Sequence, residues 1–314
     1  MASMRVLVMG LVWLAGCMLT NAVQAQDRIR LGILPFSEAL GAVIADREGY
    51  FKAEGIEVEM SKFNSGALSL PLLQAGKLDI ALSNTVSTLQ ALEQGLQGVI
   101  LAPAAITRAS GEDSTTAVMV LKGAIKSPKD LEGKRIAVNV INSSAWLNLV
   151  AYLDVHHVDR SKVRMLEVPF PQMNDPLLNG QIDAIAQVEP FRTVLLDSGK
   201  VEVLGYSYVE AQPNADITQY LSTRAWVSKN PQVAVRFARA ITRANEYLQG
   251  NEAAVREANQ QFTNLNPALK DRVLLPRFGT AVNMAQIERT MELMIKYGLL
   301  KQPVDLANRT LAQR

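Results

Sequence analysis

The chain has 314 residues, of which 48% are hydrophobic and 20% are charged, and its formal net charge is +2. This is the composition of a globular protein with enough apolar residues for two domain cores. The near-balanced charge does not suggest the concentrated basic surface typical of nucleic-acid-binding proteins, so we expect no nucleic-acid partner.

The first 25 residues have the features of an export signal. Arg5 precedes an uncharged apolar stretch from Val6 to Leu19, which is too short to span a membrane. Val23 and Ala25 are small residues placed for cleavage before Gln26. The sequence therefore predicts a signal peptide at residues 1–25 and a periplasmic location in a bacterium.

Lipid anchoring is an alternative to soluble secretion. Leu14-Ala15-Gly16-Cys17 resembles the lipobox of bacterial lipoproteins, in which the cysteine is acylated and becomes the new N-terminus. Cys17 is the only cysteine of the chain. Cleavage after Ala25 would therefore leave no residue for a disulfide, a thiol nucleophile or a thiolate metal site.

The predicted elements alternate between strands and helices along the chain. Strands are expected at 28–34, 56–60, 98–103, 116–120, 134–140, 163–168, 200–204 and 219–227, and helices at 38–47, 85–93, 127–131, 144–155 and from Pro231 onward. This alternation predicts an α/β fold with mainly parallel sheets.

One segment occurs twice. Residues 71–81 (PLLQAGKLDIA) recur as residues 176–185 (PLLNGQIDAI), and each copy follows an alternating strand. Each reads as a short helix ended by Gly76 or Gly180, followed by an aspartate and an apolar strand. Glycine and aspartate turns are common in α/β proteins, but the shared pattern favours a duplication and predicts two similar lobes around a cleft.

The position of the two copies predicts how the lobes divide the chain. We expect the first lobe to contain residues 27–116 and 217–314, and the second lobe to contain residues 117–216. Two crossing strands, at 116–120 and 219–227, would connect the lobes.

Four motifs together resemble a known family. They are Glu48–Val58 (EGYFKAEGIEV), Ser127–Val138 (SPKDLEGKRIAV), Gly180–Ala184 (GQIDA) and Glu189–Phe191 (EPF). In this order they resemble bacterial solute-binding proteins for sulfonates, nitrate, taurine and thiamine-pyrimidine precursors, over roughly residues 28–260. One departure is Val188, because the family often has tryptophan before the Glu-Pro pair.

The resemblance implies a bilobal type II periplasmic binding fold. Such a protein closes like a hinge on a small solute and delivers it to the membrane subunits of an ABC importer. It implies a monomer that is not an enzyme and has no catalytic residue, no cofactor and no metal. The two adjacent histidines, His156 and His157, point to different sides of a helix and make a poor metal pair.

Candidate ligand-binding residues follow the predicted strands, because ligands of open α/β sheets bind at the carboxyl ends of strands. They are Phe36 and Ser37, then Asn64, Ser65 and Gly66, then Ser83, Asn84 and Thr85, and in the second lobe Asn142, Ser143 and Ser144. Helix capping is the alternative role for each polar residue. We expect at least three of the four loops to contact the ligand.

Glu189 is a further candidate. Its carboxylate follows a predicted strand and is suited to bind an amine or amidine of the ligand, although pairing with Arg192 is an equally good structural role. The hydroxyl and glycine loops suit an anion, whereas Glu38 and Glu189 suit an amino-bearing solute.

Two other functions remain as alternatives. A related fold serves a pyrimidine-forming enzyme of thiamine synthesis, which consumes a histidine and uses a cysteine-rich iron site, but residues 26–314 contain no cysteine. A periplasmic protein that presents its ligand to a separate receptor is the second alternative.

Overall fold

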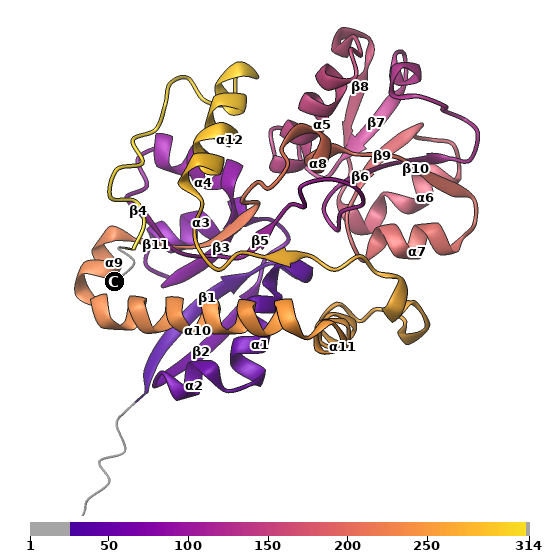
Figure 1. Cartoon of the computed structure of the whole chain (residues 1–314). Helices are drawn as coiled ribbons and strands as arrows, with labels where there is room; N and C mark the ends of the chain where they lie inside the picture. Colours follow the sequence, from indigo (N-terminus) through magenta and orange to yellow (C-terminus); the bar gives the residue numbers. More distant parts are fainter. Residues whose placement is uncertain (1–25, 312–314) are drawn as a thin grey trace, which may run out of the picture.

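The structure, a computed structural model, describes residues 26–311 (Figure 1). Two five-stranded sheets form the centres of two lobes, each with helices on its faces. The predicted signal peptide, including Cys17, lies outside the described residues. Within residues 26–311, no helix has both the length and the apolar character needed to cross a membrane.

The first lobe is built on a sheet with the strand order β2-β1-β3-β11-β4. Its strands are β1 (Asp27–Ile33), β2 (Ile56–Lys62), β3 (Ile80–Asn84), β4 (Gly98–Pro103) and β11 (Thr218–Thr223). Its helices are the 3-10 helix η1 (Ser37–Ala39), α1 (Leu40–Arg47), α2 (Tyr50–Ala53), α3 (Gly66–Gln74), α4 (Thr85–Glu93), α9 (Arg224–Lys229), α10 (Pro231–Gly250), α11 (Glu252–Thr263), η5 (Pro267–Arg272) and α12 (Met284–Lys296).

The second lobe is built on a sheet with the strand order β10-β6-β9-β7-β8. Its strands are β6 (Ala117–Leu121), β7 (Arg135–Val138), β8 (Arg164–Glu167), β9 (Ala184–Gln187) and β10 (Val201–Tyr206). Its helices are η2 (Pro128–Leu131), α5 (Ser144–Val155), η3 (Arg160–Lys162), η4 (Phe170–Gln172), α6 (Asn174–Leu178), α7 (Phe191–Asp197) and α8 (Ser207–Ala211). A separate two-stranded sheet pairs β5 (Ala105–Ile106) with β12 (Arg277–Phe278).

The two large sheets have the same topology. The order β2-β1-β3-β11-β4 in the first lobe corresponds to β8-β7-β9-β6-β10 in the second. In each sheet the first three strands of this order are parallel and the last two pairings are antiparallel. The fourth strand of the second sheet is β6, where the chain enters the second lobe. The fourth strand of the first sheet is β11, where the chain returns to the first lobe. We therefore propose residues 116 and 217 as the lobe boundaries, and we name residues 107–116 the crossing segment.

The repeated segment has the same local structure in both lobes. It forms α3 and β3 in the first lobe and α6 and β9 in the second. Gly76 and Gly180, which follow the two helices, both have a φ of 68°. This left-handed conformation is one that glycine adopts without steric cost, which explains why both copies carry glycine there.

Two sequence predictions were wrong in detail. The strand expected at 219–227 ends at Thr223, because the Thr223 hydroxyl accepts a hydrogen bond from the Trp226 amide (3.1 Å) and so begins α9. Ser37 is not a helix N-cap but lies inside η1, and its hydroxyl donates to Asn259 Oδ1 (2.7 Å).

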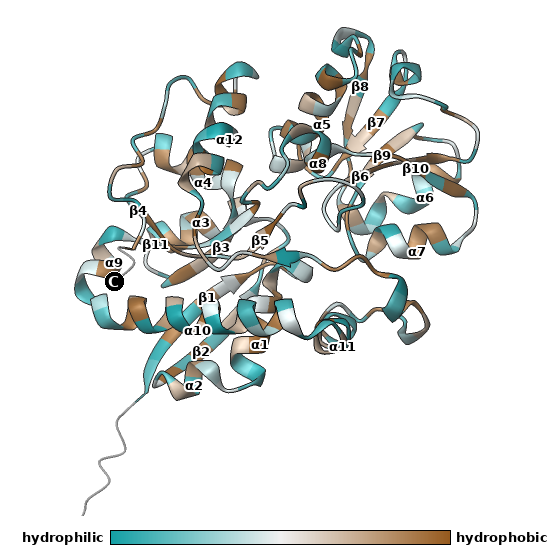
Figure 2. Ribbon diagram, viewed as in Figure 1, coloured by the Kyte–Doolittle hydropathy of each residue, from teal (hydrophilic) through white to brown (hydrophobic). Residues whose placement is uncertain are grey.

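The long helix α10 covers one side of the first sheet and packs on α1, α2 and β4. Its buried residues Val233, Phe237, Ile241, Ala244 and Leu248 recur at the helical period, so one face is apolar. Figure 2 shows hydrophobic and hydrophilic residues interspersed along this helix. The helix therefore closes the first lobe on the side away from α3 and α4.

Candidate functional site

A small cavity lies between the two lobes, with a volume of about 70 Å³. Both lobes and the crossing segment contribute to its wall. Its lining residues are Leu34, Phe36, Glu38, Asn64, Ser65, Gly66, Asn84, Ile217 and Thr218 of the first lobe, Thr115 and Thr116 of the crossing segment, and Asn139, Ser143, Ser144, Ala145, Phe170, Val188 and Tyr208 of the second lobe.

The sheet topology places this cavity. Leu34 directly follows β1 and Asn84 ends β3 in the first lobe, and Asn139 and Val188 directly follow β7 and β9 in the second. The carboxyl ends of equivalent parallel strands therefore face each other across the cavity. This is the position at which α/β sheets bind ligands.

Three helices begin at the cavity wall, and each has a polar cap that lines it. Ser65 Oγ accepts from the Ala67 amide (3.3 Å) at the start of α3, and Asn84 Oδ1 accepts from the Ser87 amide (2.8 Å) at the start of α4. Ser143 Oγ accepts from the Trp146 amide (3.3 Å) at the start of α5. The positive ends of three helix dipoles are thus directed at one small space, which favours a negatively charged group there.

Gly66 allows α3 to start close to the end of β3. A Cβ atom at this position would lie 2.7 Å from Ser83 Oγ and 3.0 Å from Ser83 Cα. Any larger residue would push the helix away from the sheet. The sequence prediction of Gly66 as a site residue therefore has a structural cause that is independent of any ligand.

Seven of the predicted site residues line the cavity. They are Phe36, Asn64, Ser65, Gly66, Asn84, Ser143 and Ser144. Their roles in binding stay predictions, since their polar atoms also serve the fold. Ser144, for example, is not the cap of α5, and its Oγ accepts a hydrogen bond from the Tyr208 hydroxyl (2.7 Å).

The structure places four other predicted residues outside the cavity wall. Thr85 is buried and its hydroxyl donates to the Asp216 carbonyl (2.5 Å), and Ser83 is buried beneath Gly66. Asn142 is exposed and adopts a left-handed conformation, with a φ of 62°. The fourth, Ser37, makes the hydrogen bond to Asn259 described above.

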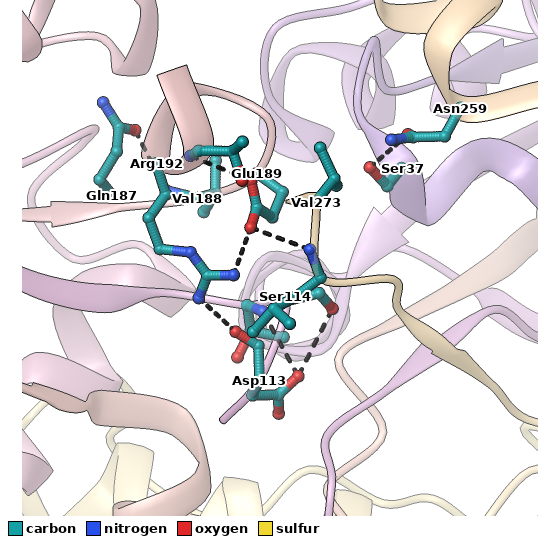
Figure 3. Close-up of polar contacts among 12 residues, drawn as sticks. Ser37, Asp113, Ser114, Gln187, Val188, Glu189, Arg192, Asn259 and Val273 are labelled. Atoms are coloured by element: carbon teal, nitrogen blue, oxygen red, sulfur yellow. Dashed lines mark hydrogen bonds and ion pairs between the residues drawn. The ribbon is translucent and has the colours of Figure 1, made fainter. Parts of the chain in front are cut away.

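Glu189 also lies outside the cavity wall, in the network drawn in Figure 3. Its carboxylate forms a buried ion pair with Arg192 and accepts hydrogen bonds from the Thr193 amide (3.3 Å) and the Leu274 amide (3.2 Å). Arg192 also donates to the Asp113 carbonyl (2.5 Å). Protein donors therefore occupy both carboxylate oxygens, which is the structural role that the sequence left as the alternative.

The Glu189 network also joins parts of the chain that are distant in sequence. Glu189 and Arg192 belong to the second lobe, Asp113 to the crossing segment, and Leu274 to the segment after η5. Figure 3 shows these groups converging on the Arg192 and Glu189 side chains. The network thus ties the second lobe to the connection between the lobes.

Thr115 is a cavity residue that sequence reasoning missed. It is 4% exposed, and its hydroxyl has no hydrogen-bond partner among residues 26–311. Buried hydroxyl groups are normally paired, so this one is available to a bound molecule. The one sequence signal for Thr115 is its position directly before the predicted strand at 116–120, which leads into the second lobe.

Glu38 is the only charged residue of the cavity wall, to which Lys, Arg and His contribute nothing among the described residues. Burial of the carboxyl group raises its pKa to about 7, and the nearby negative charge of Asp113 adds to the effect, while the Glu38 backbone amide partly opposes it. Sequence reasoning noted Glu38 only as a suitable group for an amino-bearing solute. The structure places it on the wall.

Aromatic side chains close the cavity on one side and join the lobes. The Phe36 ring of the first lobe makes edge contacts with Phe170 (5.8 Å between centroids) and Phe191 (6.3 Å) of the second lobe. Phe36 and Phe170 are both largely buried. This contact excludes water from one side of the cavity and strengthens polar interactions inside it.

No group of three or more His, Cys, Asp or Glu side chains within residues 26–311 is arranged to hold a metal ion. The cavity is instead a set of hydroxyl, amide and carboxylate groups beside aromatic and aliphatic side chains. Such a site is suited to bind a small polar molecule by hydrogen bonds.

Comparison with known proteins agrees with this description. The family model described as NMT1/THI5 like matches residues 37–254. The taurine-binding periplasmic protein of Escherichia coli is 26% identical over 72% of this chain and 68% of its own length. A 4-amino-5-hydroxymethyl-2-methylpyrimidine phosphate synthase of Aspergillus parasiticus is 22% identical over 79% of this chain and 70% of its own length.

The fold is also that of a solved binding protein. The alkanesulfonate-binding protein of Xanthomonas axonopodis pv. citri, in complex with MOPS, superposes with a TM-score of 0.73 over 90% of this chain and 97% of that chain, at 20% identity. The family match covers more than half of the chain, and the topology described above is shared by both lobes. The chain therefore belongs to the NMT1/THI5-like family and has the bilobal fold of the periplasmic binding proteins.

Proposed function

We propose that the protein is an extracytoplasmic solute-binding protein that captures a small organic anion between its lobes and delivers it to an ABC importer. The observation that carries this proposal is the cavity between the lobes, where three capped helix N-termini and the free Thr115 hydroxyl meet. Groups of this kind hold sulfonates and carboxylates without a cationic side chain.

The relatives support the same class of solute. Taurine and MOPS, which appear in the names of the two binding proteins above, are both organic sulfonates. A cavity of about 70 Å³ suits a solute of a few heavy atoms unless the lobes move apart to admit a larger one. We therefore place short-chain sulfonates and carboxylates first among the candidates.

We further propose that the protein is not an enzyme, although one relative is a synthase. The only two histidines, His156 and His157, lie at the end of α5, and neither lines the cavity. His156 Nε2 instead contacts Glu210 Oε2 (2.6 Å). The side chains that do line it are suited to hold a solute rather than to transform it. Incubation of the protein with each bound solute, followed by mass spectrometry, should return the solute unchanged.

The proposed binding role has a direct test. Thermal unfolding is recorded with a panel of short sulfonates, carboxylates and inorganic anions, and each hit is titrated calorimetrically. A solute present at 1,000 times its dissociation constant should stabilise the protein by about 4 kcal/mol. Failure of every member of the panel to bind would overturn the proposal.

Binding should bring the lobes together, since both contribute to the cavity wall. Small-angle scattering of the protein with and without a titrated solute should show a smaller radius of gyration for the complex. An unchanged radius, with binding confirmed by calorimetry, would exclude the hinge mechanism.

The mature protein is proposed to be periplasmic, and the form of its N-terminus is decided by intact mass. A mass that begins at Gln26 identifies the free protein, and a mass with acylated Cys17 identifies the anchored one. In the second case Cys17→Ala should move the protein out of the membrane fraction.

A further inference from the structure

The cavity wall carries one charge, and its sign is opposite to the one that a site for simple anions would need. Glu38 lies in η1, within the stretch where the chain passes from β1 to α1, and it is half-buried on the cavity wall, which Asn64, Thr115 and Tyr208 also line. None of the lysines, arginines and histidines of residues 26–311 forms an ion pair with it. A carboxylate placed there without a partner costs folding free energy.

The side chains around Glu38 offer it no opposite charge, and its own backbone amide is the one group that stabilises the carboxylate. The charged and titratable groups that face it are Asp113 of the crossing segment, whose negative charge repels it, and the Tyr208 hydroxyl of α8. That hydroxyl donates its hydrogen to Ser144 Oγ, in the opposite wall of the cavity. Unfavourable groups of this kind cluster at functional sites.

Glu189 shows how a glutamate with a structural role is paired in the same molecule. Glu189 is buried and Glu38 is half-buried, but Glu189 has Arg192 and two backbone amides as partners. Glu38 has only its own backbone amide. Folding alone therefore accounts for the environment of Glu189 but not for that of Glu38.

On the basis of the proposed function, we propose that Glu38 binds a protonated amine of the solute, so that the cavity selects small zwitterions, with an ammonium group and an anionic group, over simple anions. The anionic end would lie at the N-termini of α3, α4 and α5 and the ammonium end at the Glu38 carboxylate. Both charges of the solute are then matched, and repulsion between Glu38 and a simple anion would produce this selectivity.

The alternative is that Glu38 is neutral and its carboxylic acid donates a hydrogen bond to a simple anion. The raised pKa of Glu38 allows either arrangement near neutral pH. The two arrangements differ in their response to pH. If the carboxylate binds an ammonium group, affinity falls as the pH is lowered below about 7. If the carboxylic acid binds an anion, affinity rises.

The experiment compares ligand pairs that differ only in the amine. The probes are 2-aminoethanesulfonate against ethanesulfonate, and 3-aminopropanoate against propanoate, titrated calorimetrically into the parent protein and Glu38→Gln. The matched control is Glu57→Gln, which changes an exposed glutamate of β2 that is far from the cavity. Circular dichroism and the thermal midpoint verify that each variant is folded.

We expect the parent and Glu57→Gln to bind at least one amino compound about 10-fold or more tighter than its partner without the amine. In Glu38→Gln this preference should disappear, while the affinity for the partner without the amine stays the same or increases. In the parent protein the affinity for the amino compound should fall between pH 8 and pH 6, and in Glu38→Gln it should not.

Three results would overturn the inference. Equal binding of both members of each pair by the parent protein would remove the role of the amine and leave the proposed anion-binding function intact. A rise in affinity toward pH 6 would assign Glu38 as a donor to the anion. Binding of none of the four probes would overturn the proposed choice of short sulfonates and carboxylates together with this inference.

Discussion

Arg30 and Asp79 form a two-pronged ion pair that attaches the end of the repeated segment to the first strand of its sheet. Arg30 Nη2 lies 2.7 Å from Asp79 Oδ1, Nε lies 2.9 Å from Oδ2, and the Arg30 amide donates to the same Oδ2 (2.8 Å). Arg135 and Asp183 repeat the arrangement in the second lobe, with corresponding distances of 3.0, 2.9 and 2.8 Å. The duplication recognised in the sequence thus extends to individual hydrogen bonds.

The two pairs differ in exposure, and this difference predicts unequal effects of mutation. The Asp79 side chain is 11% exposed and the Asp183 side chain 29%. We expect Asp79→Asn to lower the free energy of unfolding by roughly 2–3 kcal/mol, and Asp183→Asn by roughly 1 kcal/mol. Urea unfolding at pH 7 measures both, and equal losses would contradict the argument from burial.

The same pairs predict a loss of stability in acid. Burial alone would raise the pKa of Asp79, but the hydrogen bonds from Arg30 outweigh it and the pKa lies below its ordinary value. Hydrogen bonds from Arg135 likewise lower the pKa of Asp183. A lowered pKa in the folded state gives stability that is present above the ordinary aspartate pKa and is lost as the pH falls below it. The effect of Asp79→Asn should therefore shrink in urea unfolding at pH 3.

Asn84 allows capping to be separated from binding. The residue lines the cavity, its Oδ1 caps α4, and its Nδ2 donates to Ser87 Oγ (3.1 Å). Aspartate caps helices as well as asparagine does, but it has no N–H group and adds a negative charge. We expect Asn84→Asp to retain stability within about 0.5 kcal/mol and to lose at least 10-fold in affinity for an anionic solute.

Asn84→Ala completes the comparison, because it removes both the cap and the amide. It should lose roughly 1 kcal/mol of stability as well as affinity. Calorimetric titration measures the affinity of both variants, and urea unfolding measures their stability. Unchanged affinity in Asn84→Asp would show that the residue is only a cap.

Glu189→Gln tests whether Glu189 has a structural role alone. The substitution leaves the buried Arg192 guanidinium without its counter-charge, which should cost roughly 3 kcal/mol in the free energy of unfolding. Ligand affinity, corrected for the unfolded fraction, should stay within about two-fold, because the residue lies outside the cavity wall. A large loss of affinity in a fully folded Glu189→Gln variant would show that Glu189 takes part in binding.

Tyr297 forms a further connection between the lobes. Its hydroxyl, just after α12 of the first lobe, donates to Asp154 Oδ2 (2.8 Å) in α5 of the second lobe, and Lys296 Nζ lies 3.3 Å from the same oxygen. We expect this contact to break when the lobes move apart, because its two residues belong to different lobes. Tyr297→Phe should therefore weaken ligand affinity by roughly 2- to 10-fold.

The matched control is Tyr247→Phe in α10, whose ring packs against Tyr50 within the first lobe. It should change affinity little. Equal affinities of the parent, Tyr297→Phe and Tyr247→Phe would show that the Tyr297 hydrogen bond does not contribute to lobe closure.

Local signals in the sequence were enough to predict several elements at their bounds. The helices at 85–93 and 144–155 and the strand at 98–103 coincide with α4, α5 and β4. Polar caps and hydrophobic patterns act within a few residues, so they can be recognised without the fold. The strand end at Thr223 was missed because threonine suits both a strand and a helix N-cap.

The cavity could be predicted only in part, for a physical reason. Asn84 and Ser143 follow strands, so strand ends identified them as candidates. Thr115 and Tyr208 reach the cavity only because the chain crosses between the lobes, which is a tertiary effect. Glu38 and Glu189 have the same side chain, and only the folded structure shows that Arg192 is the partner of one and absent from the other.

The strand order of the two sheets has a consequence for the time course of folding. The second lobe takes all five strands, β6 to β10, from one uninterrupted stretch of chain, so it can assemble as soon as that stretch is available. The first lobe cannot, because β11 lies between β3 and β4 and is synthesised only after the whole second lobe. Pairings between distant segments form slowly. We therefore expect the second lobe to fold first, and β3 and β4 to keep unpaired edges, open to aggregation, until residues 218–223 insert between them.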